Sequence, residues 1–199
     1  MKAVFVRHGQ TDWNAAHRMQ GCVDILLNET GKEQIKEVAG KIEGMKFDKM
    51  YVSPLTRTKQ TASILRPEME QTIEERVKEI DFGELEGSCY GGYKNLVYEE
   101  LSDKEKQIYH FFLDPDKYEP LPGGETYNHF YERLNDFLED IKVKHKDETV
   151  LVVCHGAVIH AVICLIRKIT MGECWKIYIG NGDCYMAEFD GQKWNDKLF

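Results

Sequence analysis

Residues 4–11 read VFVRHGQT, a short apolar run followed by a cation, an imidazole and a glycine. The run predicts a buried strand over residues 2–6, and Gly9 allows a sharp turn directly after it. Arg7 and His8 are then held side by side at the end of a strand. A planar guanidinium with several donors, next to an imidazole that can act as nucleophile or base, suits a phosphate site.

The composition of the chain is typical of a soluble globular domain with a substantial core. It has 199 residues, of which 42% are hydrophobic and 30% are charged. The formal net charge of −8 disfavours nucleic acids and anionic membranes as partners. The sequence has no apolar run long enough to span a membrane and begins with a core-like strand, so we expect a cytoplasmic protein. The six cysteines lack a metal-binding spacing, and we expect free thiols.

Strands and helices are expected to alternate along most of the chain. Further strands are predicted over 47–52, 71–77 and 149–154, and helices over 31–43, 55–65, 125–146 and 157–168. Thr30 is the expected N-cap of the helix at 31–43. An antiparallel pair, 175–179 with 184–189, is expected to close the sheet through a turn at 181–183.

This order of elements predicts an α/β fold, a three-layer α/β/α sandwich around a mostly parallel mixed sheet. The whole chain, residues 1–199, is expected to form one domain. Residues 83–120 are glycine- and proline-containing and less regular, and we expect them to form an insertion over the active site, with an amphipathic helix near 93–113. Ligands of such sheets bind at the carboxyl ends of the strands.

Basic side chains follow three of the predicted strands. They are Arg7 and His8 after the first strand, Arg57 shortly after the second, and His155 directly after the strand at 149–154. A lone His-Gly dipeptide is most often structural, but two of them at the ends of two apolar strands favour a functional role. The segment 78–83 adds carboxylates near another strand end.

A series of motifs resembles the histidine phosphatase superfamily, which has the phosphoglycerate-mutase-like fold. The motifs, in the order of that family, are RHGQTxxN at 7–14, RxQGxxDxxLNxxG at 18–31, SPLxRxxQTA at 53–62, ExxFGxxEG at 79–87, PGGET at 122–126 and VxxHG at 152–156. The resemblance covers roughly residues 1–165. It is far more specific than any one motif, and it implies the phosphatase branch of the superfamily.

The resemblance implies a phosphohistidine intermediate at His8. The ring nitrogen that attacks phosphorus must be unprotonated, so the other nitrogen is expected to donate to a backbone carbonyl. Arg7, Arg57 and His155 would bind the phosphoryl oxygens. Glu79 matches the position of the family's proton donor, and it must begin protonated, so we expect its pKa to be raised.

Other residues are expected to complete the site. Asn14, Gln20, Gly21 and Gly156 would contact the phosphate or the substrate near it. No metal or cofactor is expected, because arginine and histidine supply the positive charge. Asp81, Glu84 and Glu86 remain alternatives to Glu79 as the acid. The aromatic residues of the insertion either line the substrate pocket or pack its interior; they are Tyr90, Tyr93, Tyr98, Phe111 and Phe112.

The charge of the insertion favours a phosphatase over a mutase, which must hold a second acidic group. Residues 77–132 contain no arginine, and residues 93–120 hold four lysines against seven acids. The HGAVI sequence at 155–159 also looks like the phosphatase branch. We expect hydrolysis of a small phosphorylated metabolite, as in α-ribazole phosphatase and broad-specificity relatives. A phosphoglycerate mutase and a non-catalytic phospho-ligand binding module remain alternatives, and the pair at 175–189 offers an edge for a homodimer.

Overall fold

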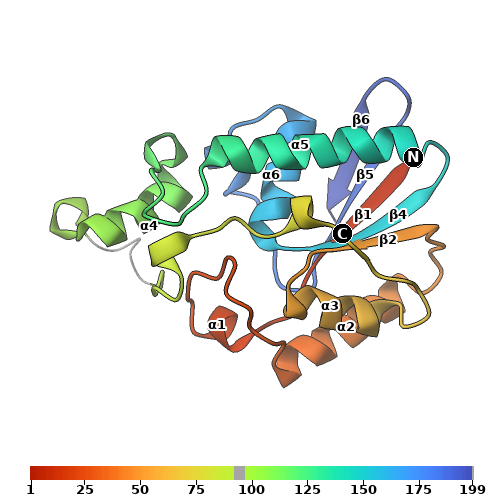
Figure 1. Ribbon diagram of the computed structural model, residues 1–199, viewed down its shortest axis with the longest axis horizontal. Coiled ribbons are helices and arrows are strands. Elements are labelled where there is room, and N and C mark those ends of the chain that lie inside the picture. The colour runs from red at the N-terminus through yellow and green to blue at the C-terminus, as the bar shows by residue number, and fades with distance from the viewer. Residues whose placement is uncertain (92–96, 199) are drawn as a thin grey trace.

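One mixed sheet organises the computed structural model, which describes residues 1–91 and 97–198 (Figure 1). Its strands are β1 (Lys2–Arg7), β2 (Lys49–Val52), β3 (Thr72–Ile73), β4 (Thr149–Cys154), β5 (Cys184–Phe189) and β6 (Trp194–Leu198). They lie in the order β3-β2-β4-β1-β5-β6. The neighbours from β3 to β1 are parallel, whereas β5 runs antiparallel to β1 and to β6. The predicted mostly parallel mixed sheet is confirmed.

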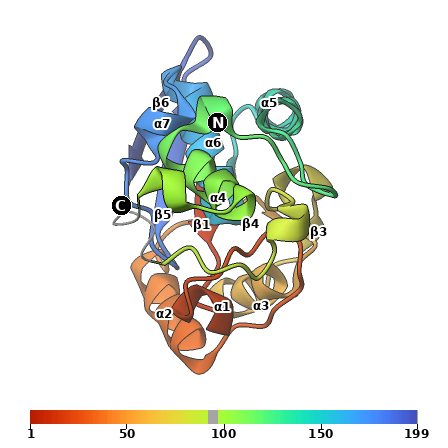
Figure 2. The ribbon, with the colours of Figure 1, turned by 90° about the vertical axis from the view of Figure 1, so that its left-hand side faces the viewer.

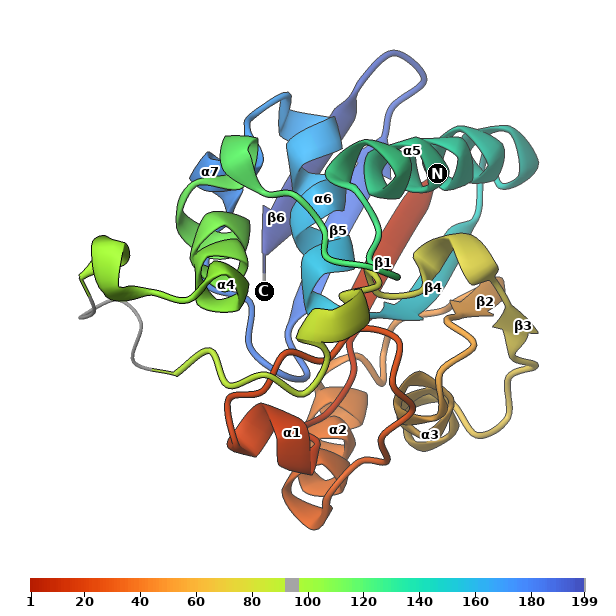
Figure 3. The same ribbon diagram turned by 60° about the vertical axis from the view of Figure 1, so that its left-hand side comes forward.

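Helices cover both faces of this sheet. One face carries α2 (Glu29–Lys41) and α3 (Thr56–Leu65), and the other carries α5 (Tyr127–Lys144) and α6 (Gly156–Arg167) (Figure 3). Side chains alternate along a strand, so Val4 and Val6 of β1 enter the core beneath α2 and α3. Ala3 and Phe5 enter the core beneath α5 and α6. The predicted three-layer α/β/α sandwich is therefore confirmed.

The segment 83–120 is joined at its two ends, because Phe82 and Gly124 form an antiparallel bridge. It contains α4 (Asp103–Leu113), whose Ile108 and Phe111 are buried in the core beneath α5 and α6. Figure 2 shows α4 on that side of the sheet, away from α2 and α3. The remaining short helices are α1 (Asp12–Ala15) and α7 (Met171–Cys174), with 3-10 turns at 75–77, 83–85, 98–100 and 115–117.

Three expected element boundaries are wrong. The N-cap of α2 is Asn28, not Thr30, because the Asn28 side chain accepts from the backbone N–H of Gly31 at 2.8 Å. The strand expected over 71–77 is β3 alone, followed by a 3-10 turn. The helix expected near 93–113 starts only at Asp103 among the described residues, after Ser102 as N-cap, and 92–96 lie outside them.

The closing antiparallel pair is also assigned differently in the structure. Residues 175–179 form no strand, because Thr170 caps α7 just before them and the Trp175 ring packs 4.2 Å from the His160 ring, measured between centroids. β5 pairs instead with β1 and β6, so β6 forms the edge of the sheet. The turn around Gly182 lies against the end of β1, where its N–H donates to the carbonyl of Arg7 at 3.1 Å.

The six cysteines are all free thiols, and four of them are buried. Within the described ranges, no helix combines the length and the apolar character needed to cross a membrane.

Candidate active site

The carboxyl ends of β1, β2 and β4 bring the predicted residues together. β4 lies between the other two strands, and the backbone N–H groups of His8 and Ser53 both donate to β4 carbonyls, at 3.0 and 3.1 Å. His155 follows β4 directly. The rings of His8 and His155 are 5.2 Å apart between centroids, at an angle of 65°. The two His-Gly dipeptides thus meet at one edge of the sheet.

The imidazole of His8 is held in one tautomer. Its Nδ1 lies 2.8 Å from the carbonyl oxygen of Gly9, and because a carbonyl only accepts, Nδ1 carries the proton. Nε2 therefore keeps its lone pair, which accepts from Nε of Arg57 at 3.2 Å. Burial, and then the charges of Arg57 and Arg7, hold the pKa of His8 well below its usual value. The ring is neutral at pH 7, with the expected backbone partner.

Arg57 links this histidine to the loop that precedes α2. Its Nη2 donates to the carbonyl of Gly21 at 2.6 Å, and its Nη1 donates to that of Val23 at 3.0 Å. The side chain is fully buried, and burial lowers its pKa to about 10, which leaves it charged at neutral pH. Gly21 has no room for a Cβ, because the carbonyl of Ile80 and the carboxylate of Glu86 press against it.

Three buried side-chain nitrogens at this edge have no hydrogen-bond partner within the described part of the chain. They are Nε of Arg7, Nδ1 of His155 and Nε2 of Gln20. The nitrogens of Arg7 and Gln20 are donors, and Nδ1 of His155 is a donor when Ser53 donates to Nε2, so this edge suits an anionic acceptor. Arg7 and His155 were predicted to bind the phosphoryl oxygens, and Gln20 to contact the phosphate or the substrate near it. The other end of the Arg7 guanidinium donates through Nη1 to the carbonyl of Ile179 at 2.6 Å.

Gly156 lies directly against Arg7 at the start of α6. A Cβ at this position would lie 3.3 Å from both Cζ and Nε of Arg7. A larger residue would therefore press on the guanidinium whose Nε is unpaired. The predicted role of Gly156 near the phosphate fits this placement.

His155 is oriented by a side chain that the sequence analysis did not assign to the site. Its Nε2 lies 2.7 Å from the hydroxyl oxygen of Ser53. Burial, with Arg57 as the next cause, holds the pKa of His155 well below its usual value. When Ser53 donates this hydrogen bond, the proton of the neutral ring lies on the unpaired Nδ1. Ser53 follows β2 directly, which was the available signal for this role.

Glu79 is the carboxyl that faces the two arginines. Its Oε1 accepts from the N–H of Ile80 at 3.1 Å, and its Oε2 accepts from the N–H of Ala157 at 3.2 Å. Burial raises its pKa, against the opposing effects of these donors and of Arg57 and Arg7. The predicted direction of this shift is confirmed.

The alternative acids are engaged elsewhere or face solvent. Asp81 accepts from the N–H of Gly83 at 2.9 Å, and Glu86 accepts from the N–H groups of Gly21 and Cys22 at 3.0 and 2.6 Å. Glu84 is exposed.

Asn14 and Gln20 are both oriented through their carbonyl oxygens. Oδ1 of Asn14 accepts from the N–H of Thr11 and from Nδ2 of Asn181, both at 3.1 Å. Oε1 of Gln20 accepts from the Thr11 hydroxyl at 2.6 Å. Asn181 also lies 3.1 Å from the carbonyl oxygen of His8. It comes from a turn near the far end of the chain, and no local pattern indicated its place here.

The sequence profile described as the histidine phosphatase superfamily (branch 1) matches residues 3–199. The chain belongs to this superfamily. This histidine phosphatase is 38% identical to a metal-independent phosphoserine phosphatase of Arabidopsis thaliana, over 96% of its own length and 77% of the relative's. It is also 30% identical to a 2,3-bisphosphoglycerate-dependent phosphoglycerate mutase of Parvibaculum lavamentivorans, over 94% and 90% of the two chains.

A solved structure shows the same fold. A mutant of the phosphoserine phosphatase of Entamoeba histolytica, in complex with phosphoserine, superposes with a TM-score of 0.84 and 28% identity, over 99% of this chain and 95% of that one.

Two of the aromatic residues of the insertion have a packing role in the structure. Phe111 is buried in the core, and Tyr98 packs against Tyr109 and His110, so both serve packing. Tyr90 is half-buried and near enough to Arg7 that the guanidinium acts on its pKa, although burial dominates and raises that pKa. The Phe112 ring packs against that of Tyr90 at an angle of 43°, with 5.5 Å between centroids. Tyr93 lies outside the described residues.

Proposed function

We propose that this histidine phosphatase hydrolyses small phosphomonoesters without a metal, through a phosphohistidine on Nε2 of His8. The observation that supports it most is the neutral His8 ring, whose unprotonated Nε2 lies 3.2 Å from Nε of Arg57 and whose centroid lies 5.2 Å from that of His155. Nε2 would attack phosphorus in line with the ester oxygen. The bond from phosphorus to that oxygen breaks as the bond from nitrogen to phosphorus forms.

Glu79 would transfer the protons of both half-reactions. In the first, its carboxyl gives a proton to the departing alkoxide, so the product is a neutral alcohol. In the second, the carboxylate takes a proton from a water molecule that attacks the phosphohistidine, and the bond from nitrogen to phosphorus breaks. The second step yields inorganic phosphate and restores both His8 and the protonated Glu79. Its raised pKa suits a group that must begin as an acid.

The charges of the site match a phosphomonoester, which carries a charge of nearly −2 at neutral pH. Arg7 and Arg57 contribute two positive charges. His8 and His155 are neutral, because burial and the arginines lower their pKa values. Phosphate would replace the acceptor that Arg57 now has in His8, and it would satisfy the unpaired donors of Arg7, Gln20 and His155.

For the alcohol part we propose an amino-acid-sized group, with phosphoserine as the first substrate to test. The support is the identity to a phosphoserine phosphatase and the superposition on another in complex with phosphoserine. The alternative is a phosphoglycerate mutase, which the identity to the Parvibaculum enzyme favours. The cytoplasmic location and the homodimer stay predictions. With β6 at the edge of the sheet, a second copy would pair there rather than at 175–179.

The test is hydrolysis of phosphoserine, 3-phosphoglycerate and p-nitrophenyl phosphate in the presence of EDTA, with the His8→Ala variant as control. We expect phosphate release that this variant loses. Isomerisation of 3-phosphoglycerate, primed with 2,3-bisphosphoglycerate, that outpaces phosphate release would establish the mutase instead. Binding of phosphoserine without turnover of any of these esters would establish a phospho-ligand binding module.

A further inference from the structure

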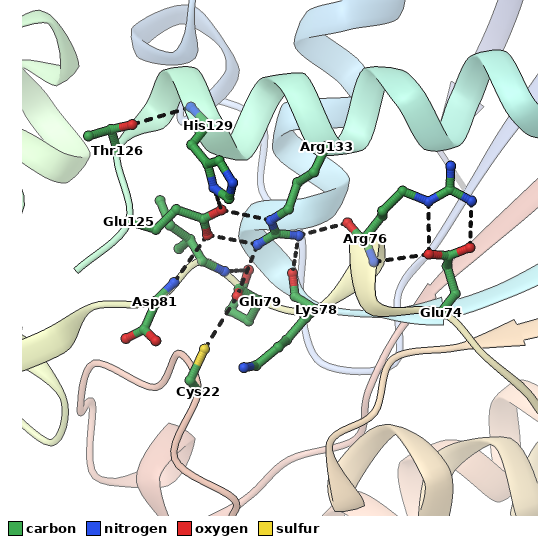
Figure 4. A network of polar contacts seen from close by, with 11 residues as sticks. Cys22, Glu74, Arg76, Lys78, Glu79, Asp81, Glu125, Thr126, His129 and Arg133 are labelled. Atoms are coloured by element: carbon green, nitrogen blue, oxygen red, sulfur yellow. Dashed lines mark hydrogen bonds and ion pairs between the residues drawn. The ribbon is translucent and has the colours of Figure 1, made fainter. Parts of the chain in front are cut away.

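Arg133 of α5 binds the backbone of the segment that contains Glu79. Nη1 of Arg133 donates to the carbonyl oxygens of Arg76 and Lys78, both at 2.7 Å, and Nη2 donates to that of Glu79 at 3.2 Å (Figure 4). A single guanidinium thus fixes three peptide carbonyls within four residues. A planar group with donors at fixed angles holds such a set more rigidly than a flexible ammonium would.

The same guanidinium is itself held by Glu125. Nε and Nη2 of Arg133 donate to the two carboxylate oxygens at 2.7 and 2.8 Å, which is a bidentate pair. Both side chains are largely buried, with 15% and 10% of their surface exposed, so water screens the pair little. Although burial opposes it, Arg133 holds the pKa of Glu125 below its usual value. Glu125 also binds Asp81 through the backbone, N–H to carbonyl at 2.8 Å.

These contacts leave the Glu79 peptide little freedom. Its carbonyl is bound by Arg133, and the Cys22 thiol lies 3.7 Å from the same oxygen (Figure 4). With the backbone fixed there, the side chain extends to the N–H of Ala157 at the start of α6. The carboxyl thus sits between a held backbone and the helix that follows His155.

We propose that Arg133, held by Glu125, is a positioning residue for the proton transfer by Glu79. It touches no reacting atom; it sets the backbone at residues 76–79 so that the carboxyl meets the departing oxygen. A displacement of about 1 Å at such a group lowers a rate by as much as about 100-fold. The inference rests on the proposed function, in which Glu79 is the acid.

Arg76 provides the matched control. It lies in the same stretch, and it too binds two carboxylates, from Glu74 at 2.7 Å and Asp140 at 2.9 Å. Within the described ranges, the Arg76 guanidinium donates to the carboxylates of Glu74 and Asp140 and to no carbonyl of residues 78 or 79. Loss of Arg76 removes ion pairs next to the active site but leaves the backbone of Glu79 fixed.

The experiment compares a good leaving group with a poor one, p-nitrophenyl phosphate with phenyl phosphate. Departure of phenolate needs a proton more than departure of nitrophenolate does, and the second half-reaction is the same for both esters. The ratio of the two kcat/KM values, which depend only on the steps through the first half-reaction, therefore reports the acid. We expect Arg133→Gln to lower kcat/KM about 30- to 100-fold for phenyl phosphate and less than about 3-fold for p-nitrophenyl phosphate. Arg133→Lys should recover part of the loss, and Arg76→Gln should leave the ratio at the wild-type value.

A double variant separates positioning from general damage. If Arg133 acts through Glu79, the pair Glu79→Gln and Arg133→Gln should lose no more activity on phenyl phosphate than Glu79→Gln alone. Equal losses on both esters, or additive losses in the double variant, would overturn the inference. If Arg133→Gln does not fold, the same ratio of activities on the two esters is measured for Glu125→Gln and Arg133→Lys. A larger loss on phenyl phosphate would support the inference, and equal losses would overturn it.

The proposed function can fail separately. A wild-type protein that hydrolyses neither aryl phosphate contradicts that function directly. A wild-type protein that hydrolyses both, with a Glu79→Gln variant whose ratio is unchanged, removes Glu79 as the acid and this inference with it.

Discussion

The two His-Gly junctions share a dipeptide and a strand context, yet they present opposite ends of the imidazole to the same site. At the end of β1, His8 gives its Nδ1 proton to the carbonyl of Gly9 and turns its Nε2 lone pair inward. At the end of β4, His155 directs Nε2 to the Ser53 hydroxyl and leaves Nδ1 unpaired. In each ring, one nitrogen faces the phosphate and the other binds a neighbouring group of the protein. The identity of that neighbouring group, not the His-Gly dipeptide, therefore decides whether the ring attacks phosphorus or donates to the phosphoryl oxygens.

The largest effect should come from removing the attacking ring. His8→Ala should lower kcat for p-nitrophenyl phosphate by at least about 10⁴-fold, because it removes the nitrogen that we propose attacks phosphorus. Rapid mixing with labelled phosphoserine, quenched in alkali, should detect a phosphoenzyme only in the protein that keeps His8. An equally labelled His8→Ala protein would contradict the comparison, because it would give the nucleophilic role to His155.

Removing the donating ring should have a smaller effect. His155→Ala takes away one preorganised donor to the phosphoryl oxygens, which is worth about 10²- to 10³-fold in kcat. The phosphoenzyme should still form, more slowly, on His8. If the loss matched that of His8→Ala, the two rings would not divide the work as we propose.

The two rings should contribute alike to the pH dependence of stability. Both folded pKa values are lowered by burial and the arginines, so unfolding takes up protons below about pH 6.5. Their stabilisation is complete above that pH and is lost as the pH falls, by up to about 1.4 kcal/mol per pH unit for each ring. The raised pKa of Glu79 acts in the opposite direction.

Urea unfolding between about pH 7 and pH 5 gives the change of the free energy of unfolding with pH. We expect this slope to be smaller in His8→Gln and in His155→Gln than in the wild type. A slope reduced in only one variant would mean that the other ring is charged in the folded protein.

The smallest effect should come from Ser53→Ala. It removes the group that orients His155 and leaves His8 untouched, so kcat should fall by about 3- to 10-fold, the range of one hydrogen bond. Nitrogen NMR of the histidine rings should show a changed tautomer signal for His155 alone. Ser53→Thr keeps the hydroxyl and serves as control; a Ser53→Ala spectrum identical to that of the wild type would remove Ser53 from the site.

The sheet and the basic residues could be predicted because the information is local. The apolar runs that form β1 and β4 stand next to the residues they deliver, and parallel strands carry those residues to one edge. The prediction of a strand at 175–179 was wrong. It relied on the apolar residues Trp175, Ile177 and Ile179 at every second position, a pattern that is typical of a strand. The Thr170–Glu173 capping box, a helix signal just upstream, was the better guide.

The partners that orient the site could not be predicted in the same way. Asn181 reaches His8 across 173 positions, and Arg133 reaches Glu79 across 54. The N–H of Ala157 that holds the carboxyl of Glu79 belongs to the backbone, which has no signature in the sequence. Such contacts follow from the packing of distant segments, so motif spacing indicates which groups do the chemistry but not what holds them.

The position of β1 has a consequence for how the protein is made. β1 lies in the middle of the sheet, between β4 and β5, although it is the first strand to be synthesised. At about 5–20 residues per second, its second neighbour follows roughly 10–35 s later. Until then an apolar strand has at least one open edge, and the site around the attacking histidine is incomplete. We therefore expect the nascent chain to depend on protection by chaperones, and to be inactive until nearly all of it has emerged.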